Sequence, residues 1–124
     1  MKSTYYGDHW WGYVARLERQ CDNPPKVVKI GITNALDPIM RLTFRRYDEP
    51  HPITDYFKDI EVLKKLVFKT KFDAERWERK VMGMTKKKFN SIKFHNWKEN
   101  DLISGITEMR IWIDEEVNFI LSID

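Results

Sequence analysis

Glu78 is a carboxylate that the sequence places beside a buried surface. Its segment has apolar residues at helical spacing, namely Ala74, Trp77, Val81 and Met84. Thr70 and Asp73 can cap the start of this helix. At 100° per residue, Glu78 lies about 60° closer to the centre of the apolar stripe than Glu75 does. A carboxylate held against a core needs a partner, which can be an Arg or Lys in an ordinary ion pair or a hard divalent cation.

The positive charge of the chain is distributed unevenly. The segment Glu99–Asp124 has seven acidic residues and one arginine, which gives it a net charge of −6. Because the whole chain has a net charge of +3, residues 1–98 have a net charge of +9. Short clusters with aromatic residues between them contain most of the cations: Arg41-Arg45-Arg46, Lys64-Lys65, Lys69-Lys71, Arg76-Arg79-Lys80 and Lys86-Lys87-Lys88. This pattern suits a polyanionic partner. A solvated lysine-rich surface gives the same pattern, so charge alone does not decide between them.

Length and composition restrict the class of protein. A chain of 124 residues with 42% hydrophobic and 33% charged residues is expected to fold as one globular domain over residues 1–124. No apolar run approaches the roughly 18 residues of a membrane span, and the N-terminus lacks a secretory signal. We therefore expect a cytoplasmic protein without a membrane partner. The lone Cys21 and three scattered histidines indicate neither a disulfide nor a zinc site.

The chemistry-bearing residues must be positioned by strands and helices that the sequence also predicts. Residues 10–17 and 27–33 have strand composition, and the polar stretch with two prolines between them favours a hairpin. A third strand is predicted over residues 60–68, although a helix is possible for its first half.

The first helix has clear start signals and aims two arginines together. Asp37 is a suitable N-cap and Pro38 fits the first helical position, so the helix should run to about Tyr47. Arg41 and Arg45 are four residues apart and therefore lie one turn above the other.

Four short motifs occur along the chain in a particular order. They are Gly12-Tyr13-Val14 on the first strand, Lys29-Ile30-Gly31-Ile32-Thr33 on the second, Arg41 in the following helix, and Ala74-x-x-x-Glu78 in a later helix. This order resembles the GIY-YIG nuclease superfamily. The Lys-Ile-Gly triplet, followed by Asp37-Pro38 and Arg41-Leu42, resembles the branch common in phage and bacterial proteins. Near the end of this chain, Thr107–Trp112 is followed by a short amphipathic helix from Asp114 to Ile123. This arrangement is similar to the way in which members of that branch end.

The chain departs from the family pattern at two places. Lys29 stands where many members have the tyrosine of the second triplet, and the first triplet has Tyr13 in the middle, followed by Val14. The stretch between the triplets is also longer than is typical. Asn90 after Phe89 resembles a Phe-Asn pair that follows the catalytic helix in excision-repair members.

The resemblance implies an α+β fold with a small central antiparallel three-stranded sheet flanked by helices. It also implies a metal-dependent endonuclease that hydrolyses DNA phosphodiester bonds with one Mg²⁺ or Mn²⁺ bound by Glu78. Arg41, assisted by Arg45, would stabilise charge on the phosphoryl oxygens. Tyr13 and Lys29 would position and deprotonate the attacking water, which for the lysine requires a pKa lowered by neighbouring cations or desolvation.

The remaining predicted residues are a further base and the phosphate contacts. His51, in a loop between prolines, would replace or assist the base, although such a histidine is more often structural or exposed. Contacts to DNA phosphates are expected from Arg45, Arg46, Lys86, Lys87 and Lys88. Cutting both strands would require a homodimer or two sequential nicks. Two other functions stay open: a catalytically weak or silent nucleic-acid- or protein-binding module on the same fold, and an interaction protein that docks through its acidic C-terminal quarter.

Overall fold

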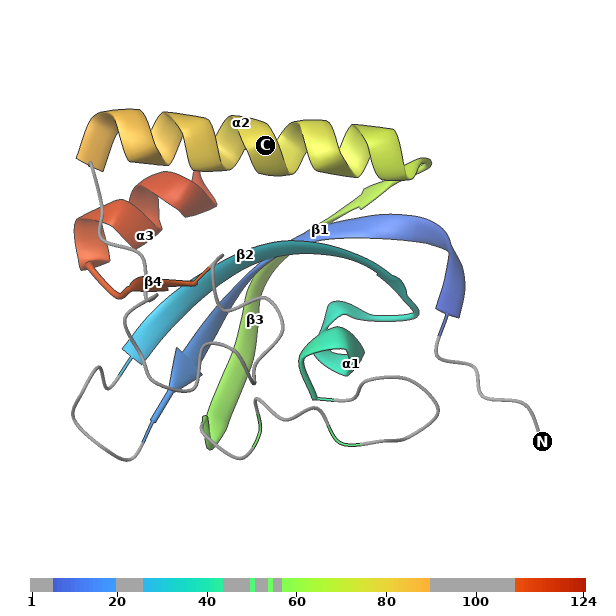
Figure 1. Ribbon diagram of the computed structural model, residues 1–124, viewed down its shortest axis with the longest axis horizontal. Helices are drawn as coiled ribbons and strands as arrows, with labels where there is room; N and C mark the ends of the chain where they lie inside the picture. Colours follow the sequence, from blue (N-terminus) through green and yellow to red (C-terminus); the bar gives the residue numbers. More distant parts are fainter. Residues whose placement is uncertain (1–5, 20–25, 44–49, 51–53, 55–56, 90–108) are drawn as a thin grey trace.

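The described residues form an α+β fold in which a four-stranded antiparallel sheet carries three helices (Figure 1). This computed structural model describes residues 6–19, 26–43, 50, 54, 57–89 and 109–124. In chain order, the elements are β1 (Tyr6–Glu18), β2 (Lys26–Ala35), α1 (Pro38–Thr43), β3 (Asp59–Phe68), α2 (Lys71–Phe89), β4 (Met109–Ile111) and α3 (Asp114–Leu121). Within these residues, no helix combines the length and the apolar character needed to cross a membrane.

The strands that carry the two triplets are neighbours in the middle of the sheet. The strand order is β3-β1-β2-β4, and every pairing is antiparallel. Tyr13 of β1 lies opposite Gly31 of β2, and Ala15 lies opposite Lys29. The predicted antiparallel pair and the predicted strand over residues 60–68 are confirmed, so the helical alternative for the latter is wrong.

The sheet has four strands, so the predicted number of three was wrong. The additional strand, β4, is only three residues long and pairs with β2 at Val27–Lys29. Three residues are too few for the alternation of a strand to show in the sequence, and the pairing partner is far away along the chain. Beyond Lys29, β2 has no further strand beside it on this side among the described residues.

The predicted start of α1 is confirmed by its cap. The side chain of Asp37 accepts a hydrogen bond from the N–H of Ile39 at 3.1 Å, and the helix begins at Pro38. The helix was predicted to reach about Tyr47. Its described part ends at Thr43, and the continuation lies outside the described residues.

The predicted start of α2 is also confirmed, whereas one of its predicted core residues is not. Thr70 Oγ1 accepts a hydrogen bond from the N–H of Asp73 at 3.2 Å. Met84 was expected on the buried stripe but is 43% exposed. Thr85 is buried instead, and its hydroxyl donates to the carbonyl oxygen of Val81 at 2.7 Å. A threonine hydroxyl that donates to a backbone carbonyl of its own helix can be buried at little cost in free energy. A hydropathy pattern does not show this, because it counts threonine as polar.

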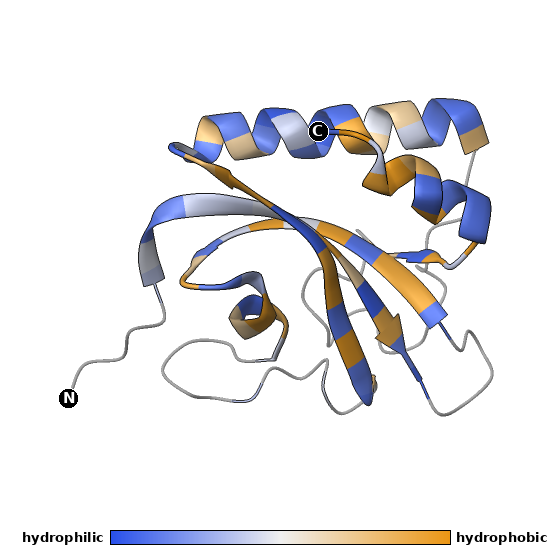
Figure 2. Cartoon of the chain, turned by 180° about the vertical axis from the view of Figure 1, so that it is seen from behind, coloured by the Kyte–Doolittle hydropathy of each residue, from blue (hydrophilic) through white to orange (hydrophobic). Residues whose placement is uncertain are grey.

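Hydrophobic cores cover both faces of the sheet. One core contains Tyr13, Ala15, Leu17, Val27, Leu42, Phe57 and Met109, and the other contains Val14, Val28, Ile30, Trp77, Val81, Val117, Ile120 and Ile123. Helix α1 contributes to the first core, and α2 and α3 contribute to the second. Successive residues of β1 alternate between the two, as the period of a strand requires. Figure 2 shows hydrophobic residues concentrated in the strands and α3, and hydrophilic bands along α2.

Gly12 allows α2 to pack closely on the sheet. A Cβ atom at this position would lie 2.5 Å from Cε3 and 2.7 Å from Cζ3 of Trp77. The indole of Trp77 therefore rests directly on the strand backbone, where it is 4% exposed. Its Nε1 donates to the carbonyl oxygen of Ile123 at 3.4 Å. The position of α2, and hence of Glu78 beside Trp77, depends on this contact.

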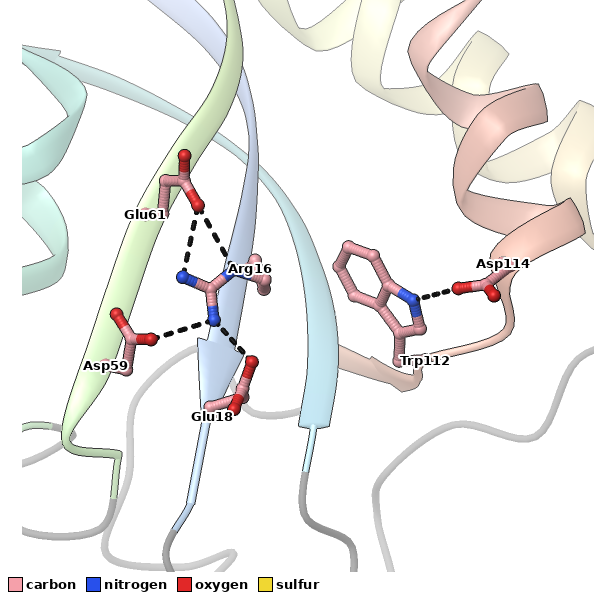
Figure 3. Close-up of polar contacts among 6 residues, drawn as sticks. All are labelled: Arg16, Glu18, Asp59, Glu61, Trp112 and Asp114. Carbon is pink, nitrogen blue, oxygen red and sulfur yellow. Dashed lines mark hydrogen bonds and ion pairs between the residues drawn. The ribbon is translucent and has the colours of Figure 1, made fainter.

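At the other end of β1, Arg16 connects the first and third strands. Its guanidinium contacts Glu18 at 2.6 Å, Asp59 at 3.0 Å and Glu61 at 3.1 Å (Figure 3). The hydrogen bond with Asp59, followed by the other carboxylates, raises the pKa of Arg16 although burial alone would lower it. The cation thereby balances three acids that would repel one another at this end of the sheet.

Candidate functional site

A cavity of about 310 Å³ brings together four of the predicted catalytic residues, Tyr13, Lys29, Arg41 and Glu78. They come from β1, β2, α1 and α2 respectively. The other described residues that line it are Trp10, Ile32 and Lys71. The sequence suggested the four residues only by the order of short motifs, so their proximity is new information.

Tyr13, and not Val14, is the residue of the first triplet that faces the cavity. Val14 belongs to the core on the opposite face of the sheet. The phenol of Tyr13 crosses over Gly31, where an added Cβ would lie 2.6 Å from its hydroxyl oxygen. Gly31 therefore leaves the space that the phenol occupies. Tyr13 is 1% exposed, so its hydroxyl is held inside the molecule.

Lys29 lies on the same side of β2 as the space above Gly31, because side chains two residues apart share a face. It is 2% exposed, and its Nζ lies 5.9 Å from the centre of the Tyr13 ring. A buried ammonium group at this distance from a phenol is unusual for a residue that merely solvates a surface. Lys29 thus adds a basic side chain to the cavity beside the phenol of Tyr13.

Helix α1 brings Arg41 to the cavity while two neighbours fix the helix. Leu42 is buried against the sheet. At the helix start, Lys65 of β3 donates to Asp37 at 2.8 Å. Burial would raise the pKa of Asp37, but the hydrogen bonds from Lys65 and from the N–H of Ile39 outweigh it and hold the pKa below the ordinary 3.8.

Helix α2 contributes Glu78 and also a residue that sequence reasoning missed, Lys71. The two are seven residues apart, so they lie on one helix face about 10.5 Å apart along the axis. The ammonium group of Lys71 lies 5.5 Å from the ring centre of Trp10, which also lines the cavity. The seven-residue spacing from Glu78 was the available signal. This signal is weak, because Lys71 also forms a charge cluster with Lys69 in the sequence.

The remaining predicted residues do not meet at this cavity in the described part of the chain. Arg45, Arg46 and His51, as well as Asn90, lie outside the described residues. Three further lysines, Lys86, Lys87 and Lys88, are exposed in the last turn of α2, away from the lining. Their predicted role does not therefore involve the reacting atoms.

The lining residues give the cavity a definite chemical character. Lys29, Arg41 and Lys71 are cationic, and Glu78 is the one acid among the described lining residues. Such a cavity can accept an anionic oxygen group such as a phosphodiester. No three His, Cys, Asp or Glu side chains gather anywhere in the described residues. A hard cation at Glu78 would therefore take most of its ligands from water or from a phosphate, which fits a site that fills together with its substrate.

Comparisons with protein-family models, with curated proteins and with solved structures found no match for this chain.

Proposed function

We propose that this protein is a metal-dependent endonuclease of the GIY-YIG type, with the corresponding fold, that hydrolyses phosphodiester bonds in DNA. The supporting observation is that Tyr13, Lys29, Arg41 and Glu78 line one cavity although they belong to four different elements. Motif order selected these residues without any information on their distances. A shared cavity is expected if they act on one substrate, and is not required if each has an independent structural role.

Glu78 would hold one Mg²⁺ or Mn²⁺ by its carboxylate. When bound, the ion would polarise the scissile phosphate and stabilise the leaving oxygen. Glu78 is the one acid among the described lining residues, and the cations around it oppose metal binding until a phosphate arrives. Metal affinity should consequently be weak in the free protein and higher in the presence of DNA.

The other lining residues would bind the phosphate and activate water. Arg41 presents a planar set of donors that suits phosphoryl oxygens, whose charge grows during the reaction. Tyr13 and Lys29 are buried on adjacent strands, so either can orient a water. The one of the two that is present as a phenolate or a neutral amine would accept the proton of this water. The water oxygen forms the new bond to phosphorus, and the bond to the leaving alcohol oxygen breaks. One phosphate monoester and one hydroxyl end result.

Nicking of a supercoiled plasmid with Mg²⁺ or Mn²⁺ tests this proposal. Glu78→Gln should slow cleavage by about 100-fold or more, as is common when one charge-stabilising group is lost. Glu75→Gln is the matched control, because Glu75 is a similarly half-exposed carboxylate of α2 that does not line the cavity. Arg41→Lys keeps the charge but loses the planar donor set, so it should also be slow. Equal rates in all four proteins would place the activity elsewhere.

The excess of cations over carboxylates in the cavity favours a second candidate function. In this alternative, the protein is a nucleic-acid-binding module on the same fold without catalytic activity. With Lys29, Arg41 and Lys71 around it, Glu78 can be neutralised without a metal. This alternative predicts no cleavage by the parent, salt-sensitive DNA binding, and Mn²⁺ binding that Glu78→Gln does not change. The nuclease proposal predicts that this substitution weakens Mn²⁺ binding measured with DNA present.

A further inference from the structure

The outward face of α2 carries a row of cations separate from the cavity. At 100° per residue, five exposed basic residues fall within an arc of about 120°: Arg76, Arg79, Lys80, Lys86 and Lys87. Within α2, no acidic residue falls in this arc. We call these five residues the α2 ridge. Because Glu78 lies about 140° around the helix from the middle of the arc, the ridge and the cavity face different directions.

Few contacts within the described chain occupy the α2 ridge. Lys80 donates to the main-chain oxygen of Asp124 at 2.9 Å, and the guanidinium of Arg76 lies 5.8 Å from the ring centre of Phe72. For the rest, the described residues contain no side-chain carboxylate within ion-pair distance. Arg79, Lys86 and Lys87 are thus available to an external anion, whereas Lys80 also interacts with the carboxylate of Asp124.

Gly83 lies in the middle of the α2 ridge and has no internal explanation. It is exposed within a helix of 19 residues, and a Cβ added to it would meet nothing within 4 Å. Glycine is the poorest helix former after proline, so this position weakens α2 without making room for any described neighbour. Cations lie one turn before it, at Arg79 and Lys80, and one turn after it, at Lys86 and Lys87. Bare helix backbone between cations permits the close approach of another chain.

We propose that the α2 ridge is a second nucleic-acid-binding surface, on which a phosphodiester backbone crosses the helix at Gly83. The cations before and after the glycine are about 10 Å apart along the axis, so they can contact separate phosphates. Apolar anchors for an acidic protein segment lie beside the first half of the ridge only, where Leu66, Val67 and Phe68 line a hollow together with Arg76, Arg79 and Lys80. None lies in the described arc beyond Gly83, so a phosphodiester backbone, which needs cations along the whole ridge, fits better. The surface holds a nucleic-acid segment other than one in the cavity, so the protein can contact two segments at once.

A control lysine lies away from the α2 ridge. Lys58 is exposed just before β3, and its ammonium donates to the main-chain oxygen of Thr54 at 3.3 Å. We expect Arg79→Gln with Lys87→Gln to weaken binding of a short DNA duplex, measured by fluorescence anisotropy in EDTA so that cleavage plays no part. Each lost phosphate contact should reduce the slope of log K against log salt by about 0.9, on the order of tenfold at about 0.1 M salt. Lys58→Gln should bind like the parent.

Gly83→Gln separates close approach from charge. Glutamine is a good helix former, so this variant should unfold at a higher temperature than the parent yet bind the duplex several-fold more weakly. Unchanged binding by both Gly83→Gln and the double variant would overturn the proposal. An equal loss in Lys58→Gln would do so as well, because it would indicate a general charge effect. Polyglutamate that binds the parent as tightly as an equal charge of DNA would overturn the nucleic-acid assignment.

Discussion

Replacement of Gly12 by alanine tests whether this glycine positions α2. The new Cβ would lie 2.5 Å from Cε3 and 2.7 Å from Cζ3 of Trp77, and 3.1 Å from Cε2 of Phe68. Favourable carbon contacts begin near 3.5 Å, so the indole has to withdraw by about 1 Å. Trp77 is 4% exposed and tied to Ile123 by its Nε1, so it cannot swing into solvent. The helix that carries it must move instead.

The expected magnitude follows from this overlap. Forcing an extra carbon into a packed core typically costs about 1–3 kcal/mol. The reduced entropy of the unfolded chain offsets about 0.4–1 kcal/mol of that. A net loss of about 1–2 kcal/mol should lower the melting temperature by about 4–8 °C in a domain of this size. Since Glu78 follows Trp77, a displacement of about 1 Å should also slow cleavage, on the order of 100-fold.

Equilibrium urea unfolding provides the assay, with Gly12→Ala measured in two backgrounds. Trp77→Leu removes Cε3 and Cζ3, the two atoms that the new Cβ would strike. In that background, Gly12→Ala should cost little, which gives a coupling free energy of about 1–3 kcal/mol. An equal loss in both backgrounds, with unchanged dependence on urea, would refute the argument. It would mean that Gly12 is required by the conformation of β1 and not by the contact with α2.

Two further predictions concern the other side of the sheet. Gly31→Ala places a Cβ 2.6 Å from the hydroxyl oxygen of Tyr13, so the phenol should leave the cavity and plasmid nicking should fall by about 100-fold; a parent-like rate would remove Tyr13 from the proposed mechanism. Lys65→Met should raise the pKa of Asp37, measured by NMR of its carboxyl carbon, because burial then acts with less opposition. A pKa below 3.8 in the folded protein stabilises it above that pH, and this contribution disappears as the pH falls through the lower, folded-state pKa. The stability difference between parent and Lys65→Met should therefore shrink on acidification below 3.8, and a constant difference would contradict the ion-pair explanation.

Helices and strands were predicted correctly where the residues that favour them lie within or next to the element itself. The caps at Asp37 and Thr70 involve bonds two or three residues away, and both helix starts were predicted correctly. The third strand, over residues 60–68, has the apolar and β-branched composition that a strand needs. By contrast, β4 depends on a pairing with Val27–Lys29, which only the folded chain brings close. Its three residues carry too little information to predict it.

Four residues of the candidate site were predicted from the sequence, but the geometry of the site was not. Motif order identified Tyr13 but left its orientation open, because a shift of one residue in register turns a strand side chain to the other face. The pairing of Tyr13 with Gly31 decides that orientation. Trp10 and Lys71 could not be assigned for a related reason. Their proximity depends on how α2 crosses β1, which is determined by the contact between Gly12 and Trp77.

The shortness of β4 explains how one cavity reaches both faces of the sheet. Tyr13 and Lys29 belong to the face that carries α1, whereas Ile32 and Glu78 belong to the α2 side, yet all four line the same cavity. Among the described residues, β4 covers the edge of β2 only as far as Lys29, so the edge beyond it is open. Gly31 adds no side chain there. A longer β4 would close this edge and separate Arg41 on α1 from Glu78 on α2.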